Sequence, residues 1–233
     1  MITVILAGGL GSRLSEYTEM IPKPMVDICG EPIILKIIKH YRKFGYKKFI
    51  IATGYKSEII KYYFQNNKKN FSDIEVKTIF TGKNSLTGTR VKKLNKYLID
   101  ENFFLTYGDG LSTLNIKNLL NFHIKNKKLA TITAVHPPAR FGELILNKSV
   151  VTNFEEKPQL QKGWINGGFF VLNKGFLKLI SNKNEMIERG PIKKAVKLNQ
   201  VCAYKYEGFW HCIDTKRDKD LLEDLIQKKR IKL

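Results

Sequence analysis

The sequence predicts an α/β protein: a Rossmann-like, mixed but mostly parallel sheet flanked by helices. Two patterns support this fold class. Short apolar, β-branched runs alternate with helical segments, and the first run ends in glycines. A third observation is length, because 233 residues with 43% hydrophobic content suffice for one domain with a sizeable core. We therefore expect residues 1–233 to form a single domain whose parallel strands are joined by right-handed crossovers.

The first half of the chain shows the clearest alternation. Strands are expected over residues 2–7, 48–53 and, with a weaker pattern, 71–80. Helices are expected over residues 33–43, 57–64 and 91–98. Ser57 is the expected N-cap of the second helix, because a serine hydroxyl can accept a hydrogen bond from a free backbone N–H of the first turn.

The second half continues the pattern and adds a hairpin. Strands are expected over residues 102–106, 129–135, 169–172 and 201–206, and helices over residues 191–198 and 215–229. Two short apolar runs, 143–146 and 150–154, flank the pair Asn147-Lys148 and predict a small β-hairpin subregion.

The loop after the first strand is the first candidate binding site. Glycines 8, 9 and 11 remove Cβ atoms, so a phosphate chain can approach the backbone N–H groups closely. Arg13 adds a planar fork of donors, and Lys23, placed between two prolines, adds a point charge. The loop is neither a Walker A motif nor a dinucleotide fingerprint. We interpret it as a triphosphate cradle; the alternative is an ordinary strand–turn–helix corner.

Asp109 is a candidate metal ligand. It follows a predicted strand within Tyr107-Gly108-Asp109-Gly110, and ligands of open α/β sheets bind beyond the carboxyl ends of the strands. A carboxylate there can bind Mg²⁺ and leave most of the metal shell to water and phosphate. An aspartate of this kind is often only a turn residue, but the preceding triphosphate cradle favours the metal.

Composition bounds the remaining possibilities. Forty-one Lys and Arg residues against 21 Asp and Glu give a net charge of +20, which raises nucleic-acid binding as an alternative. The lysines are spread along the chain, which is typical of a solvated surface, so no specific nucleic-acid partner is expected. Three cysteines without metal-ligand spacing predict reduced thiols. We also expect no signal peptide, no membrane span and a cytoplasmic location.

Eight segments occur in a fixed order along the chain: LAGGLGSRL, PKPM, LTGTR, YGDG, PPARFG, EEKP, INGGFF and GFWHCIDT. This series resembles the sugar-1-phosphate nucleotidyltransferases, and within them the glucose-1-phosphate cytidylyltransferases. The resemblance implies transfer of a cytidylyl group from CTP to a sugar 1-phosphate, with glucose 1-phosphate as the first candidate. The products would be a CDP-sugar and pyrophosphate. The cofactor would be Mg²⁺.

The resemblance also assigns roles to individual residues. Catalytic roles fall on Arg13, Lys23, Asp109 and Asp214, of which the two aspartates would hold the metal. Nucleotide contacts fall on Leu6, Gly8, Gly9, Gly11, Ser12, Thr87, Gly88, Arg90 and Gly108. Sugar-phosphate contacts fall on Arg140, Glu156, Lys157, Asn166 and Gly167. Two of these residues have ordinary structural interpretations as well: Asp214 as the N-cap of the last helix, and Arg140 as a surface-loop residue.

Two departures from the family pattern limit what the resemblance implies. Gly190 stands where relatives carry a glutamate, and the segment from Phe64 to Leu86 is shorter than theirs. A homo-oligomer is expected, but its form and the sugar stay open. The same chemistry with another nucleotide, a nucleotide-sugar glycosyltransferase and a basic nucleic-acid-binding module also stay open. His211 is expected to be a packed or rim residue, since no Ser, Cys and His arrangement indicates nucleophilic catalysis.

Overall fold

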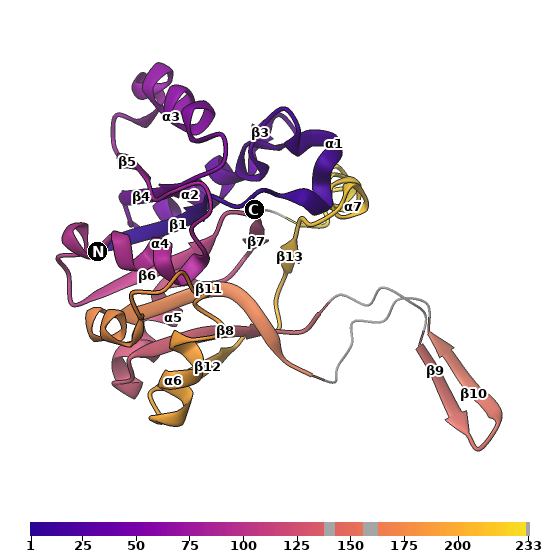
Figure 1. Ribbon diagram of the computed structural model, residues 1–233. Helices are drawn as coiled ribbons and strands as arrows, with labels where there is room; N and C mark the ends of the chain where they lie inside the picture. Colours follow the sequence, from indigo (N-terminus) through magenta and orange to yellow (C-terminus); the bar gives the residue numbers. More distant parts are fainter. Residues whose placement is uncertain (138–142, 156–162, 232–233) are drawn as a thin grey trace.

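The computed structural model describes residues 1–137, 143–155 and 163–231. A seven-stranded sheet forms its centre, with the strand order β12-β8-β11-β6-β1-β4-β5 (Figure 1). The strands are β1 (Ile2–Ala7), β4 (Lys48–Thr53), β5 (Glu75–Phe80), β6 (Asn102–Tyr107), β8 (Ala130–Val135), β11 (Ile165–Asn173) and β12 (Val201–Lys205).

Strand directions make this sheet mixed but mostly parallel, as predicted. β1 pairs in parallel with both β4 and β6, β4 with β5, and β8 with β12. Only β11 runs against its neighbours, pairing antiparallel with β6 and β8. The fold class expected from the alternation of strands and helices is therefore confirmed.

Helices cover both faces of the sheet, because side chains of a strand alternate between its two faces. Ile5 and Ala7 of β1 belong to one apolar core, and Val4 and Leu6 to the other. The first core takes side chains from α2 (Ile33–Lys43), α3 (Ser57–Asn66), α5 (Ile116–Asn126) and α7 (Lys216–Gln227). The second takes them from α4 (Thr87–Lys93) and α6 (Pro191–Lys197).

The helix boundaries correct three sequence predictions and add one helix that was not predicted. The expected helix 91–98 begins earlier, at Thr87, and the unpredicted helix α5 follows Asn115, whose side chain caps it. Ser57 is not an N-cap, because α3 begins at Ser57 itself. Asp214 does not cap the last helix either. Thr215 does so, forming a reciprocal capping box with Asp218.

Short elements complete the structure. They are α1 (Ser15–Thr18), β2 (Asp27–Ile28), β3 (Glu31–Pro32), β7 (Gly110–Ser112) and β13 (Trp210–Cys212). The predicted hairpin is present as β9 (Glu143–Asn147) paired antiparallel with β10 (Val150–Glu155), and Figure 1 shows it apart from the main sheet. No helix in the described part of the chain is both long and apolar enough to cross a bilayer.

Substitution of Phe104 tests how much the first core contributes to stability. Its side chain is fully buried on β6 and meets the rings of Tyr41 and Tyr46 at centroid distances of 5.3 Å and 4.6 Å. Phe104→Ala should lower the free energy of unfolding by about 3–5 kcal/mol, because it removes apolar burial and leaves a cavity. Urea unfolding measures this. The control Ile99→Ala, at a side chain 76% exposed, should change it by less than about 0.5 kcal/mol.

Candidate active site

The site lies at one edge of the sheet, where β1 and β6 end. These strands are adjacent and parallel, so the glycine loop after β1 and the Gly108-Asp109 turn after β6 meet there. The chain continues from β1 to β4 on one side, whereas β6 lies on the other, which makes this edge a topological switch point. Because β11 is antiparallel, its first residues, including Asn166 and Gly167, lie at the same edge.

A small two-stranded ribbon brings the two predicted metal ligands together. β7 directly follows Asp109 and pairs antiparallel with β13, placing Cys212 opposite Gly110. The backbone N–H of Ile213 donates to the carbonyl oxygen of Asp109 at 2.9 Å. Asp214, the next residue, is thereby held beside Asp109.

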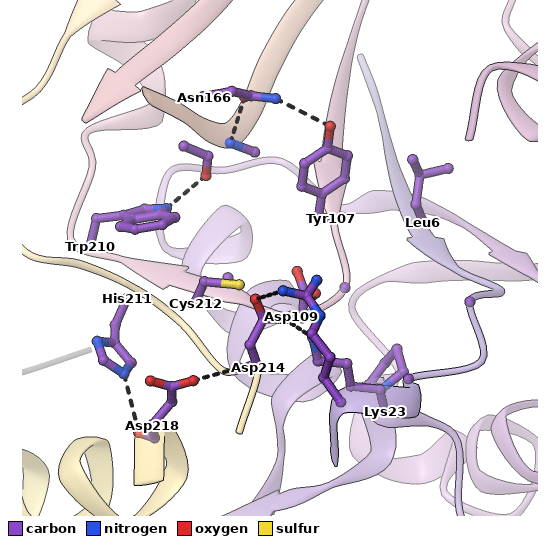
Figure 2. Close-up of a pocket in the computed structure, with 18 of the residues that line it drawn as sticks. Leu6, Lys23, Tyr107, Asp109, Asn166, Trp210, His211, Cys212, Asp214 and Asp218 are labelled. Atoms are coloured by element: carbon purple, nitrogen blue, oxygen red, sulfur yellow. Dashed lines mark hydrogen bonds and ion pairs between the residues drawn. The ribbon is translucent and has the colours of Figure 1, made fainter. Parts of the chain in front are cut away.

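Two cations from the N-terminal loop meet these carboxylates (Figure 2). The Lys23 ammonium lies 2.7 Å from Asp109 Oδ2 and 2.6 Å from Asp214 Oδ1, and Arg13 Nη1 lies 2.7 Å from Asp214 Oδ2. Burial acts to lower the pKa of Lys23, but the charge of Asp109 and hydrogen bonds to both aspartates outweigh it and raise this pKa. Lys23 is therefore fully charged at neutral pH.

The two carboxylates also belong to a group that could hold a metal ion, with Cys212 as the third member. Their candidate ligand atoms all lie within 4.8 Å of one another, and Figure 2 shows the Cys212 sulfur pointing toward them. Burial, followed by the charges of Asp109 and Asp214, raises the pKa of the Cys212 thiol. A neutral thiol beside two carboxylates leaves a donor set of oxygens, which fits a hard divalent cation. The Lys23 ammonium already shows that a cation fits between the carboxylates.

A second polar cluster surrounds Tyr107, at the end of β6. Its hydroxyl contacts Glu188 and accepts a hydrogen bond from Asn166 Nδ2 at 3.2 Å, while Thr87 Oγ1 donates to Glu188 at 3.0 Å. Burial and the neighbouring Glu188 carboxylate raise the pKa of Tyr107, so the phenol stays protonated. No role for Tyr107 or Glu188 was predicted from the sequence. Their contacts join segments 81 residues apart, which no local pattern indicates.

Gly167 and Gly168 form the close-packed start of β11. Trp210 Nε1 donates to the Gly167 carbonyl oxygen at 2.7 Å. Gly168 has a φ of +77°, and a Cβ there would lie 2.6 Å from the Tyr107 ring. Glycine is therefore required at position 168 both by its backbone conformation and by space.

One cavity of about 1240 Å³ unites these groups. The predicted site residues that line it are Leu6, Gly8, Gly9, Gly11, Ser12, Arg13, Lys23, Thr87, Arg90, Gly108, Asp109, Asn166, Gly167 and Asp214, joined by Tyr107, Glu188 and Cys212. Gly88 is not among the described lining residues, and its N–H donates to the Glu185 carbonyl oxygen at 3.0 Å. The predicted sugar-phosphate contacts Arg140, Glu156 and Lys157 lie outside the described residues. His211 is buried, as predicted, with Nε2 3.1 Å from the Asp218 carbonyl oxygen.

An open α/β sheet with a glycine loop, two cations and two carboxylates at its switch point defines an enzyme that handles phosphorylated ligands. Comparison with known proteins gives the family. A family model described as nucleotidyl transferase matches residues 2–213, and the chain belongs to this family. The family expected from the eight motifs is thus confirmed.

Individual relatives agree with this assignment. A glucose-1-phosphate cytidylyltransferase of Salmonella typhimurium is 43% identical over 98% of this chain and 96% of its own length. A probable glucose-1-phosphate cytidylyltransferase of Bacillus subtilis is 38% identical, covering 96% of this chain and 94% of its own. Among solved structures, HddC of Yersinia pseudotuberculosis complexed with GMP-PN has a TM-score of 0.73 at 25% identity, covering 97% of this chain and 99% of its own.

Lys23 gives a pH-dependent test of the ion cluster. Lys23→Met should lower the free energy of unfolding at neutral pH by about 3 kcal/mol, because it leaves two partly buried carboxylates without their shared cation. The folded-state pKa lies above the ordinary value of 10.5, so this contribution is complete below 10.5 and is lost as the pH rises through the folded-state pKa. The difference between wild type and variant should therefore shrink at alkaline pH.

Denaturant unfolding over a pH series without divalent cations measures this difference. The matched control is Lys39→Met, which removes an ion pair between Lys39 and Glu31. These two side chains are 50% and 32% exposed, respectively. It should cost less than about 1 kcal/mol. A Lys23 effect no larger than the control would show that the cluster adds no stability.

Proposed function

We propose that this enzyme transfers a cytidylyl group from CTP to a sugar 1-phosphate, most simply glucose 1-phosphate, giving a CDP-sugar and pyrophosphate. The observation that carries the proposal is that Lys23 joins Asp109 and Asp214 in the same large cavity that the glycine loop lines. The choice of CTP and glucose 1-phosphate rests on the 43% identical relative, which spans nearly the whole chain.

The glycine loop and its two cations would bind the triphosphate. Gly8, Gly9 and Gly11 line the cavity beside Arg13 and Lys23, and the backbone N–H groups of a glycine loop suit phosphate oxygens. We assign the other predicted nucleotide contacts, Leu6, Ser12, Thr87 and Gly108, to the same ligand because they line the same cavity.

Asp109 and Asp214 would hold Mg²⁺, a hard cation that prefers carboxylate, water and phosphate oxygens. When bound, the metal would neutralise charge at the α-phosphate. Lys23 contacts both carboxylates without it, so this lysine would share them or turn toward the phosphates when the metal arrives.

The sugar phosphate would bind on the β11 side of the cavity. Asn166 can offer both a donor and an acceptor to sugar hydroxyls, and Tyr107 and Glu188 lie beside it. Gly167 would let the sugar approach, while Arg140, Glu156 and Lys157 keep their predicted roles at the sugar and its phosphate.

The reaction needs no enzyme nucleophile and no general base. An already anionic oxygen of the sugar phosphate would attack the α-phosphorus in line, forming a new P–O bond. The bond from the α-phosphorus to the bridging oxygen breaks, and pyrophosphate leaves with that electron pair. Arg13 and Lys23 would stabilise the developing charge, so catalysis is positioning and charge neutralisation. A cytoplasmic location and a homo-oligomeric assembly remain predictions of the sequence.

Substrate choice is tested by pyrophosphate release with Mg²⁺, crossing CTP, UTP, dTTP, GTP and ATP with a panel of sugar 1-phosphates. We expect release with CTP and glucose 1-phosphate. Release with CTP and another sugar would keep the reaction but replace the sugar, and Gly190 would then be examined first. No release with any pair would refute the proposed reaction. Tight, salt-sensitive duplex binding in its place would favour a nucleic-acid-binding module.

Arg13 tests the charge-stabilising role. Arg13→Ala should lower kcat by about 100-fold or more, because it removes a cation at the transferred phosphate. Its side chain is 72% exposed, so the circular dichroism spectrum and Tm should stay close to those of wild type. The control Arg42→Ala removes an arginine paired with Asp73 that is not among the described lining residues, and should keep wild-type kcat. Equal kcat in both variants would remove Arg13 from the mechanism.

A further inference from the structure

Arg90 lines the cavity, yet the residue is only 4% exposed and its guanidinium bonds protein oxygens. Nη1 donates to Thr53 O at 3.0 Å, Thr81 Oγ1 at 2.7 Å and Gly82 O at 2.8 Å, and Nη2 donates to Gly8 O at 2.7 Å and Lys83 O at 3.3 Å. These oxygens lie at or just beyond the ends of β1, β4 and β5. Arg90 thus ties together the ends of three adjacent parallel strands.

These bonds leave little for a ligand. The two Nη atoms of an arginine carry four N–H groups, and here they serve five oxygens. Burial lowers the pKa of Arg90, and among the described residues no carboxylate forms an ion pair with it. Carbonyl oxygens therefore solvate its charge, and the side chain acts on the cavity through the backbone that it holds.

The Gly8 carbonyl is the link to the cavity. Its oxygen accepts from Arg90 and, at 3.3 Å, from the Tyr55 backbone N–H. The described chain has no cis peptide bond, so the N–H of the Gly8–Gly9 peptide points away from this carbonyl. Gly9 is exposed, lines the cavity and has open space where a Cβ would be. No described residue accepts its N–H, which leaves that donor available to a ligand.

Close packing around the guanidinium explains two glycines. A Cβ at Gly8 would lie 2.2 Å from Arg90 Nη1. A Cβ at Gly54 would lie 2.5 Å from the same atom and 2.7 Å from the Gly8 carbonyl oxygen. Gly54 is not among the described lining residues, so a substitution there would act on the cavity indirectly, by displacing the Arg90 guanidinium and the Gly8 carbonyl that it holds.

We propose that Arg90 is a positioning residue for the nucleotide: by holding the Gly8 carbonyl, it fixes the Gly9 N–H toward the cavity, where that N–H binds a phosphate oxygen of the substrate. This inference rests on the proposed function, because it takes a nucleoside triphosphate as the ligand. It replaces the direct contact between Arg90 and the nucleotide that the family resemblance implies.

The first experiment measures CTP affinity by calorimetry with Mg²⁺ for wild type, Arg90→Ala and Arg90→Lys, with Tm as the readout of folding. Arg90→Ala should weaken CTP binding by about 10-fold or more, as expected for a lost hydrogen bond to a charged group. Arg90→Lys keeps the charge but cannot reach both Gly8 and Thr81, so it should bind CTP nearly as weakly. Added guanidinium, below denaturing concentrations, should restore binding to Arg90→Ala.

The second experiment is a double-mutant cycle with Gly54→Ala, which displaces Arg90 from a position outside the cavity. If Gly54→Ala acts through Arg90, the double variant should bind CTP no more weakly than Arg90→Ala alone. The matched control is Lys93→Ala. Lys93 Nζ also holds this loop, donating to Thr81 O at 2.8 Å and Ser85 Oγ at 3.1 Å, but makes no contact with Gly8. It should lower Tm without changing CTP affinity.

The outcomes separate this inference from the proposed function. If wild type binds no CTP, the proposed function fails. If wild type binds CTP and both Gly54→Ala and Arg90→Lys bind it equally well, the positioning role is wrong. Additive effects in the cycle would also overturn it, since two independent losses cannot share one contact. Should Arg90→Ala not fold, Gly54→Ala and Arg90→Lys still decide the question.

Discussion

The contact of the Lys23 ammonium with Asp109 and Asp214 is the interaction on which the site depends. Asp109 lies 86 residues after Lys23 in the sequence, and Asp214 lies 191 residues after it. The charge of one lysine therefore connects the N-terminal loop, the end of β6 and the C-terminal segment. Figure 1 shows the result: the C-terminal helix α7 lies beside the N-terminal α1. Without this cation, two partly buried carboxylates would repel each other. Because Asp109 and Asp214 flank the paired strands β7 and β13, their repulsion would oppose this pairing.

Charge balance in this cluster also explains how it can accept a highly charged substrate. Arg13 and Lys23 carry two positive charges, and Asp109 and Asp214 two negative ones, so the cluster is neutral before any ligand binds. Under the proposed function, a triphosphate arriving with a divalent cation would exchange partners with this cluster: Arg13 and Lys23 would pair with phosphate oxygens, and Asp109 and Asp214 would hold the metal. No charge would then have to be buried without a partner, which is the costly step in any low-dielectric site.

Much of this arrangement could be predicted from the sequence, because strands buried on both faces give continuous apolar runs and a glycine loop after such a run has few explanations. The features that the sequence did not predict depend on tertiary contacts. Helix α5 buries His123 among its apolar side chains, and the imidazole forms hydrogen bonds with Thr131 and Asn102. This polar residue interrupts the apolar periodicity that would otherwise indicate a helix. Helix α4 begins at Thr87 because the Gly88 N–H finds its acceptor in Glu185, nearly a hundred residues away. From the sequence, Tyr107 is an ordinary strand residue, and only its contact with Glu188 in the folded chain marks it as part of the site.

The single antiparallel strand determines how the two substrates would share the sheet edge. Parallel strands alone would present only loops that follow strands, but β11 begins where β6 and β1 end and so brings Asn166 and Gly167 to the same edge. In the strand order β11-β6-β1, the sugar-binding candidates lie on one side, the glycine loop on the other, and Asp109 between them. Under the proposed function, the sugar phosphate and the nucleotide approach from opposite sides and meet above β6. An in-line displacement requires the attacking oxygen to lie opposite the leaving pyrophosphate, and the antiparallel direction of β11 would allow that placement.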